Sequence, residues 1–538
     1  MRRNLVGWLS LIVIGGLLIT ACSPADIKEI SVSTPAFAED KTFEIHPDYS
    51  TNWWKSQPNG NSTIDPDWGG EGWLLTANEV SEGLVVSDIK TGKPIKYFQG
   101  AGTPHHVHLN KDMSRAFVTQ RYGTTMLTID METLELEEIE FPGVGLKPGP
   151  LHLGFTHDGS KVFASLNQTP DVGGAIAEID ANTGELVQII EGVGNRPRDI
   201  GITPDDKKLF ISLQSEPYIT VVDLDTYEMR KLERTQTDYG EGSGSGIDVS
   251  NDGKYVAVGN TPDNEIAIYD AETEELIKKI EAPVPVNISF MGNSPYLTSG
   301  NRGDGSTTIV NTDTWESKTI KTGSGTNIGY LGPDGLWYFS QNGEPYVTVI
   351  DPEDKFRIIR KTFGVQNIHW LMWGPDGKTM FGTNWGDRSV TNFDMTKPKH
   401  FRETIDTGLN PNGMALKTDV SNELLEKYRS EENVKQVSEE LEKARTLVIP
   451  DARNEGEEAF LNTCLNCHDV GRILRNNATG DAWQEVVDRM EGNGAIMTPE
   501  EKEAIVNYLK EDQHSTLDIK TEKQLELEEE EEAKTNGS

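Results

Sequence analysis

A C-x-x-C-H sequence, Cys464-Leu465-Asn466-Cys467-His468, lies in the last fifth of the chain. This spacing is the attachment signature of a c-type haem. The two thiols add to the two vinyl groups of the haem, and the histidine becomes the proximal ligand of the iron. Two residues between the cysteines allow both thiols to reach one face of the porphyrin. The chain has three cysteines and no second C-x-x-C, so a zinc site is disfavoured and one covalently bound haem c is predicted.

The sixth ligand of this iron is predicted to be Met490. It ends a run with helical spacing, which resembles the Trp-x-x-x-x-x-x-Met helix of short monohaem cytochromes. The apolar residues of that run are Trp483, Val486, Val487 and Met490. Met497 is the alternative ligand, and a five-coordinate or bis-histidine iron is a further alternative. A methionine opposite His468 would keep the iron six-coordinate, so the haem would transfer electrons and bind no substrate.

Two helices must position this haem in a small all-α domain, residues 451–512. The first precedes Cys464 and includes Phe460. The last begins with Thr498-Pro499-Glu500-Glu501, a capping box with proline in the first turn. Small cytochromes c cross their first and last helices, and we expect Phe460 to contact Tyr508 there.

The start of the chain accounts for the third cysteine. Arg2-Arg3 precede an uncharged apolar run, residues 5–19, which is short for a membrane span. The following Ile19-Thr20-Ala21-Cys22 resembles a bacterial lipoprotein signal, which implies a signal peptide over residues 1–21 and a diacylated Cys22. An uncleaved anchor helix is the alternative. Either places the protein outside the cytoplasm, lipid-anchored or helix-anchored to a bacterial membrane, on the cell surface or the periplasmic side.

A repeat of short apolar strands separated by Asp-Gly-type turns fills residues 67–419, after a polar tether over residues 22–66. Its period of about 40–47 residues with four strands is typical of a β-propeller blade. Seven units start near residues 103, 149, 196, 243, 284, 326 and 367. Residues 72–98 hold only three strands, and residues 410–417 resemble an isolated first strand. Their pairing would close an eight-bladed ring, with seven blades as the alternative. The predicted fold class is therefore mainly β, with a small all-α domain behind.

The remaining segments have other compositions. Residues 420–450 have the apolar spacing of an amphipathic helix or helix pair. Residues 513–538 are rich in Glu, which predicts disorder. The formal net charge of -37 argues against nucleic acid as a partner. A redox protein and, through the lipid, a membrane are the predicted partners.

Histidines gather at the starts of the predicted innermost strands, where propellers place their functional sites. They are His105, His106, His108, His152 and His369, five of the ten in the chain. Imidazole clusters suit copper, iron or zinc. The alternative is that these histidines satisfy hydrogen bonds or line a channel. Arg198 opens another unit and would favour a small anionic substrate.

Two families share parts of this pattern. The opening Thr103-Pro104-His105-His106-Val107-His108, with His152 in the next unit, resembles the copper-binding propellers of nitrous-oxide reductase and thiocyanate dehydrogenase. The combination of a c-type haem domain with a propeller resembles the cytochrome-cd type of nitrite reductase, whose eight-bladed propeller holds a second haem through a histidine at a position that His105 would match. There the c domain usually precedes the propeller, and here it follows. The repeat also resembles the broad YVTN group.

These features predict an extracytoplasmic electron-transfer protein or oxidoreductase, in which the c-type haem relays electrons to or from a site or partner at the propeller. One alternative is a docking module that only recruits a redox partner to the cytochrome. Another is a reductase or dehydrogenase of a small anion that depends on copper or on a second haem.

Overall fold

The computed structural model describes residues 65, 67–79, 81–99, 103–234, 246–363, 367–385, 387–396, 401–448, 452–464, 483–484, 486–488, 497–511 and 520–527. Cys22, Cys467, His468 and Met490 lie outside these residues, as does the side chain of Cys464. No helix among the described residues is long and apolar enough to cross a membrane.

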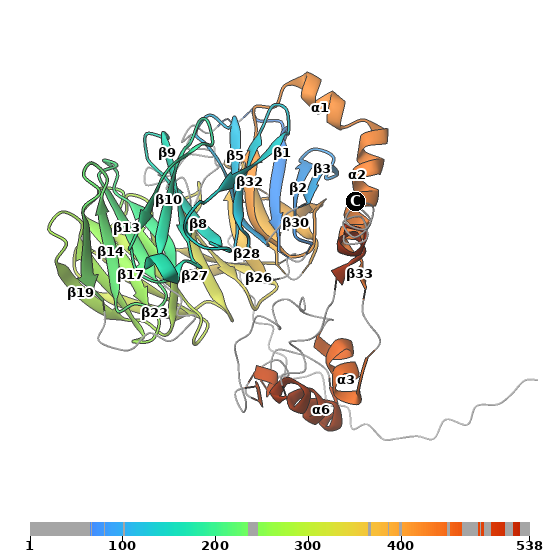
Figure 1. The fold of residues 1–538 in the computed structure, drawn as a ribbon. Helices are drawn as coiled ribbons and strands as arrows, with labels where there is room; N and C mark the ends of the chain where they lie inside the picture. The colour runs from blue at the N-terminus through green and yellow to red at the C-terminus, as the bar shows by residue number, and fades with distance from the viewer. Residues whose placement is uncertain are drawn as a thin grey trace, which may run out of the picture. The chain divides into compact units, whose positions relative to one another are not determined.

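The main body is a ring of eight four-stranded antiparallel sheets (Figure 1). The first blade holds β1 (Trp73–Asn78), β2 (Gly83–Asp88), β3 (Pro94–Gln99) and β32 (Pro411–Lys417). The second holds β4 (Pro104–Leu109), β5 (Arg115–Gln120), β6 (Thr125–Asp130) and β7 (Leu136–Glu140). The third holds β8 (Pro150–Phe155), β9 (Lys161–Leu166), β10 (Ala175–Asp180) and β11 (Leu186–Glu191), with the 3-10 turn η2 (Pro170–Val172). The fourth holds β12 (Pro197–Ile202), β13 (Lys208–Leu213), β14 (Tyr218–Asp223) and β15 (Met229–Glu233).

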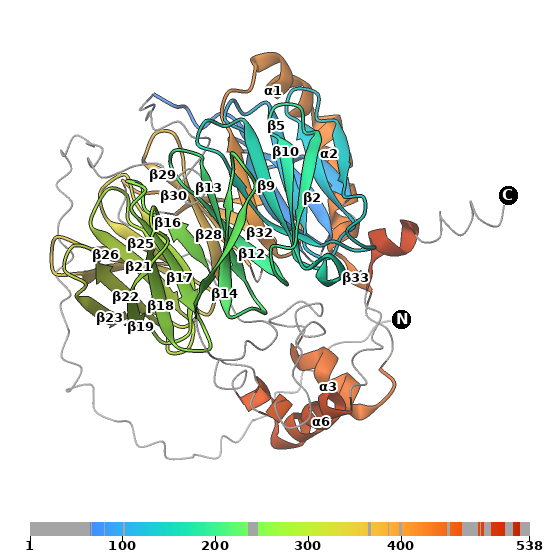
Figure 2. The ribbon, with the colours of Figure 1, turned by 60° about the vertical axis from the view of Figure 1, so that its left-hand side comes forward.

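The other four blades continue in chain order, as Figure 2 shows from another side. The fifth holds β16 (Ile247–Val249), β17 (Tyr255–Asn260), β18 (Glu265–Asp270) and β19 (Leu276–Glu281). The sixth holds β20 (Pro285–Phe290), β21 (Tyr296–Asn301), β22 (Ser306–Asn311) and β23 (Ser317–Lys321). The seventh holds β24 (Thr326–Leu331), β25 (Trp337–Gln341), β26 (Tyr346–Asp351) and β27 (Arg357–Phe363). The eighth holds β28 (Ile368–Trp373), β29 (Thr379–Asn384), β30 (Ser389–Asp394) and β31 (Phe401–Asp406).

The two ends of the propeller close the ring by sharing one sheet. β32 pairs antiparallel with β1, and Leu75 lies opposite Ala415. The innermost strands contact one another in turn from β4 through β28 to β32, and β32 contacts β4. The eight-bladed prediction is thereby confirmed and the seven-bladed alternative is wrong. Closure pairs the edges that an open sheet would leave exposed.

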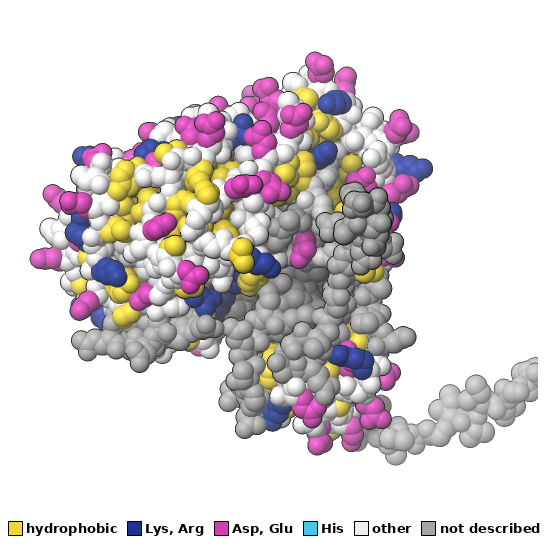
Figure 3. Space-filling model, in the orientation of Figure 1, with side chains coloured by type: hydrophobic (Ala, Val, Ile, Leu, Met, Phe, Trp, Pro, Cys, Tyr) yellow, Lys and Arg dark blue, Asp and Glu magenta, His cyan; other side chains and the backbone are white. Residues whose placement is uncertain are grey.

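The hydrophobic core lies between neighbouring blades, because no single sheet can bury both of its faces. The ring of Phe117 in β5 meets that of Phe155 in β8 at 5.8 Å between centroids. Inner strands such as β8 are buried throughout, whereas most of the outermost strand β19 is exposed. Acidic side chains are spread over the visible surface together with Lys and Arg (Figure 3).

Two helices follow the propeller. α1 (Asn422–Tyr428) is capped at its N-terminus by Ser421, whose side chain accepts a hydrogen bond from the N–H of Leu424. α2 (Glu431–Arg445) packs Val437 and Leu441 against Tyr97 of β3. The periodicity of residues 420–450 therefore predicted the helices correctly, because their apolar faces cover an outer strand.

A short strand pair joins the chain before and after residues 449–519. β33 (Leu447–Val448) pairs antiparallel with β34 (Lys520–Thr521). Lys443 forms an ion pair with Glu526 at 2.5 Å. Residues 520–527 thus differ from the predicted disorder of residues 513–538, because backbone pairing and this ion pair hold them.

The described part of residues 451–512 contains α3 (Glu455–Cys464) and α6 (Pro499–Lys510). The capping box at Thr498 and Glu501 is confirmed. So is the contact of Phe460 with Tyr508, whose ring centroids lie 5.4 Å apart. Trp483 and Val487 are buried in the same apolar cluster, and Met497 packs against it.

Candidate metal centre at the propeller mouth

Within the described residues, seven of the eight blades build the same backbone frame at the end where the innermost strand begins, which we call the propeller mouth. The residue before most of these strands has a positive φ, such as 64° at Thr103 and 55° at Arg196. Its carbonyl accepts the backbone N–H of the residue that follows the second strand, 3.0 Å from Arg121 to Thr103 and 3.0 Å from Gln214 to Arg196. Left-handed backbone costs energy at a residue other than glycine, so this hydrogen bond compensates for strain.

A β-bulge follows at once in the innermost strands. In β4 and β5, Pro104 lies opposite Gln120 and Val107 opposite Val118, so His105 and His106 together face Thr119. Successive side chains of a regular strand point to opposite faces, but a bulge changes their direction. The rings of His105 and His106 accordingly stack, with centroids 4.6 Å apart.

In five blades a hydroxyl group on the second strand supports the bulge. The N–H of His106 donates to Thr119 Oγ1 at 3.0 Å, and that of His152 to Ser165 Oγ at 3.0 Å. Asp199 and Ser212 form the same bond in the fourth blade, at 3.0 Å. A Ser or Thr next to the end of a second strand is therefore a sequence signal for these positions in the second, third, fourth, seventh and eighth blades.

Three of the five predicted histidines come together closely enough to bind one metal ion. Ligand atoms of His105, His106 and His152 all lie within 4.8 Å of one another, and all three side chains are buried. Burial lowers the pKa of His105 to about 4 and that of His106 well below its usual value. Burial also lowers the pKa of His152, against the opposing effect of Asp199. These imidazoles are neutral at pH 7, which is the form that binds metal.

The other two predicted histidines flank this group. The ring of His108 lies 5.8 Å from that of His106, and burial lowers its pKa to about 4. His369 stacks on Trp385 with centroids 5.2 Å apart, and its Nδ1 lies 3.2 Å from the amide nitrogen of Asn327. The predicted cluster of five is thus a compact group of three with two neighbours.

Two buried carboxylates orient the three-histidine group. Nδ1 of His105 lies 2.7 Å from Oε1 of Glu79. Nδ1 of His152 lies 3.3 Å from Oδ1 of Asp199. Since an ionised carboxylate only accepts hydrogen bonds, Nδ1–H is the donor in both contacts, and Nε2 is the atom left for a metal. Metal-binding histidines commonly use such partners to fix tautomer and ring orientation.

Glu79 and Asp199 are themselves held by several donors. The amide of Asn412 donates to Glu79 at 2.9 Å, and the N–H of Ile247 donates to Asp199 at 3.2 Å. Neither acid stands out in the sequence, because Glu79 follows β1 and Asp199 lies beside Arg198. Only the common frame shows that both positions recur at the mouth of the blades that share it.

Gly413 lets β32 approach the strand that carries the histidines. A Cβ atom at this position would lie 2.8 Å from the carbonyl oxygen of His105 and 2.8 Å from the Cα of His106. The closing strand therefore helps to fix the bulge of β4, since a larger residue would push the two strands apart.

Replacing Glu79 with alanine is expected to weaken metal binding by about 10–100-fold, the usual effect of removing such an outer partner. Glu79→Gln keeps an acceptor for Nδ1 of His105, so its metal affinity should lie between that of the wild-type protein and that of Glu79→Ala. Competition with a chelator measures the affinity. Glu137→Ala, which removes an exposed carboxylate of β7, is the control. Equal affinity for Glu79→Ala and Glu137→Ala would show that Glu79 does not position a ligand.

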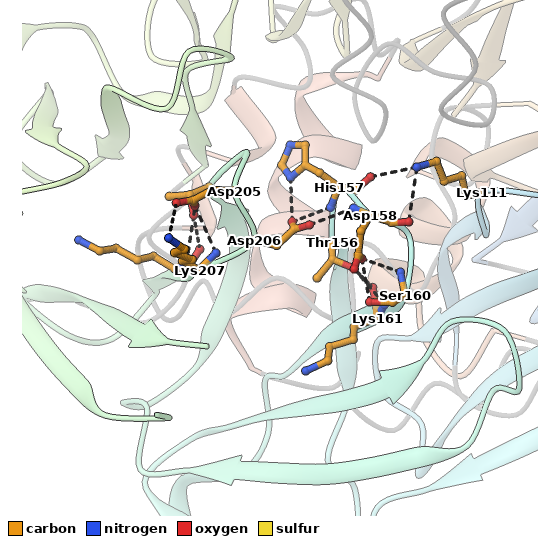
Figure 4. Close-up of polar contacts among 11 residues, drawn as sticks. Lys111, Thr156, His157, Asp158, Ser160, Lys161, Asp205, Asp206 and Lys207 are labelled. Carbon is orange, nitrogen blue, oxygen red and sulfur yellow. Dashed lines mark hydrogen bonds and ion pairs between the residues drawn. The ribbon is translucent and has the colours of Figure 1, made fainter. Parts of the chain in front are cut away.

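His157 lies away from this group, in the turn that follows β8. Its N–H donates to Asp206 at 2.6 Å, and its Nδ1 lies 3.1 Å from the same oxygen (Figure 4). Lys111 donates to the carbonyl oxygen of His157 at 3.3 Å. His157 is partly exposed and serves a turn between two blades, so it is a suitable control residue.

Comparisons with known proteins give a fold and no family. No protein-family model matches the chain, and no curated protein matches it. The solved structure of dihydro-heme d1 dehydrogenase NirN in complex with DHE matches with a TM-score of 0.52 and 15% identity, over 66% of this chain and 76% of that chain. Hydrazine synthase of Kuenenia stuttgartiensis matches with a TM-score of 0.40 and 19% identity, over 49% of this chain and 89% of that chain. The likeness to NirN concerns the fold alone.

Proposed function

We propose that this protein is an extracytoplasmic oxidoreductase in which a metal centre at the propeller mouth exchanges electrons with a c-type haem. The observation that carries the proposal is the group of His105, His106 and His152, with ligand atoms within 4.8 Å of one another. Three neutral imidazoles packed together gain little as a hydrophobic core. As ligands of one ion they satisfy their nitrogens and explain the two carboxylates behind them.

The donor set favours copper. It offers three imidazole nitrogens without a thiolate, and copper lies at the top of the affinity order for such divalent sites. Three protein ligands leave a position open, as in catalytic metal sites. Bound copper would supply a one-electron couple, so that Fe(II) and Cu(II) exchange for Fe(III) and Cu(I) or the reverse. Nε2 of His105 and Nε2 of His152 would be ligands of the ion, and the ring of Trp370 packs edge-on to that of His106, with centroids 5.1 Å apart.

The haem would be held by Cys464, Cys467 and His468, with Met490 as the sixth ligand and Met497 as the alternative. The packing of Phe460 on Tyr508 supports a domain with crossed helices in residues 451–512. A histidine–methionine iron would transfer electrons without binding substrate. Lipidation at Cys22 would anchor the protein to a bacterial membrane, and a separate redox protein would be its partner.

A second haem at the propeller mouth is the other candidate. The solved NirN structure is a complex with DHE, and the likeness in fold favours this candidate. His105 would then be the axial ligand.

Metal analysis and a visible spectrum of the purified full-length protein test these proposals. We expect one haem that stays with the denatured chain, and one copper per haem. A second haem that solvent extracts would favour the second candidate. Zinc would overturn the redox role of the mouth. Protein with one haem and no other metal after incubation with copper would leave the propeller as a docking module.

A further inference from the structure

Two arginines lie beside the three-histidine group. Arg198 belongs to the bulge of β12, next to Asp199. Arg121 follows β5 and is held through its backbone N–H by Thr103, two residues before His105. In the common frame of the blades, Arg198 therefore occupies the position of His105, and Arg121 occupies the position of Glu79. The backbone of Arg121 also approaches the start of the third blade, since a Cβ atom at Gly149 would lie 2.8 Å from the carbonyl oxygen of Arg121. Behind the larger effect of burial, the charge of Arg121 lowers the pKa of His105, His152 and Arg198.

Within the described part of the chain, neither guanidinium lies within 4.0 Å of a carboxylate oxygen in a salt bridge, although the charge of Asp199 raises the pKa of Arg198 against the larger lowering effect of burial. The two nearby carboxylates are engaged by histidines, since Glu79 bonds His105 and Asp199 bonds His152. The hydrogen bond of the Arg198 side chain runs from Nη1 to the carbonyl oxygen of Val286 at 3.5 Å, which is weak. The guanidinium of Arg121 lies 5.4 Å from the ring centroid of Tyr122.

The charges around the three histidines favour an anion once a metal ion is bound. Two acids and two arginines balance one another while the histidines are neutral, and a bound divalent ion adds two positive charges. A partly buried charge without a partner costs free energy, and an anion would offset that cost. Guanidinium groups bind planar oxyanions through paired N–H donors. The rings of Trp370 and His108 pack edge to face on one side of the histidines, with centroids 6.3 Å apart.

We infer that Arg121 and Arg198 bind a small inorganic anion against the open position of the three-histidine centre. This inference rests on the proposed function in one respect, the metal ion, and it names the substrate class of that site. The two arginines alone would still bind the anion in metal-free protein, although more weakly.

The test uses full-length protein loaded with Cu(II) and titrated with sodium azide, whose binding to copper is followed by visible absorption and by electron paramagnetic resonance. We expect Arg121→Gln and Arg198→Gln each to weaken azide binding by about 10-fold or more, from the loss of one charge-assisted contact. Arg302→Gln is the matched control. Arg302 follows β21 at the position equivalent to Arg121, and it donates to Asn327 at 3.1 Å.

The outcomes separate the two proposals. Unchanged azide affinity in both variants, with copper still bound, would overturn the anion site and leave the metal centre. An equal loss in Arg302→Gln would reduce the effect to general charge and would also overturn it. If wild-type protein binds no copper, the proposed function fails. The anion site is then tested by the thermal midpoint of metal-free protein with and without azide. Azide bound to the folded protein raises this midpoint, so the rise must be smaller in Arg121→Gln and Arg198→Gln than in wild-type protein. An equal rise in all three would overturn the anion site.

Discussion

Full-length protein with His106→Ala is expected to carry its haem and to lose the metal at the propeller mouth. His106 lies between the two other ligands, with its ring centroid 4.6 Å from that of His105 and 4.4 Å from that of His152. Its removal leaves two imidazoles, His105 and His152, and two ligands hold an ion less tightly than three. The loss of affinity should exceed the about 10–100-fold effect of an outer partner. Copper per haem after dialysis, measured by elemental analysis, reports the result.

His157→Ala is the matched control for this variant. His157 lies in the turn after β8 and is bonded to Asp206, so its loss should leave the copper content unchanged. The thermal midpoint of each variant shows whether the propeller remains folded. If folded His106→Ala protein keeps the copper content of the wild-type protein, the copper lies elsewhere. It would also remove the observation on which the proposed function rests.

Met490→Ala is expected to abolish the weak near-infrared absorption that arises from a methionine sulfur bound to ferric haem. The iron would lose its sixth ligand, and its reduction potential would fall because thioether ligation raises it. Covalent attachment through Cys464 and Cys467 should persist, so haem content per chain stays constant. Near-infrared absorption and a potentiometric titration of the same sample measure both effects.

Met497→Ala distinguishes the two candidate ligands. Met497 packs against the apolar cluster of Phe460 and Trp483, so its loss should lower stability and leave the band in place. A band that survives Met490→Ala and disappears in Met497→Ala would reverse the assignment. A band present in both variants would exclude both methionines as ligands.

The propeller was predictable because its signals are local. Alternating apolar residues and Asp-Gly turns define each strand, and the count left one strand over at residues 410–417. That strand is β32, which pairs with β1 as expected. The predicted unit starts at residues 103, 149, 196, 284, 326 and 367 lie within a residue of innermost strands. The fourth prediction, residue 243, precedes β16 at Ile247, in a blade whose start lies outside the described residues.

The site was predictable only in part, because its geometry arises between blades. The sequence placed five histidines at strand starts, but it could not separate His369 from the others. That separation follows from the ring, which brings β4 and β8 together while His369 of β28 stacks on Trp385. Glu79 illustrates the same limit. It follows β1 in the first blade, whereas His105 lies in β4 of the second blade, so their contact forms only when the two blades pack together.

By itself, the sequence determined the C-x-x-C-H haem signature, the repeat, the closing strand and the choice of imidazole donors, because each depends on residue type and short spacing. The tertiary structure decided which three histidines meet, which nitrogen His105 and His152 offer, and which carboxylates and arginines surround them. The physical reason is that a β-bulge and a left-handed residue set the direction of each side chain, and ring closure then brings together blades that are distant along the chain.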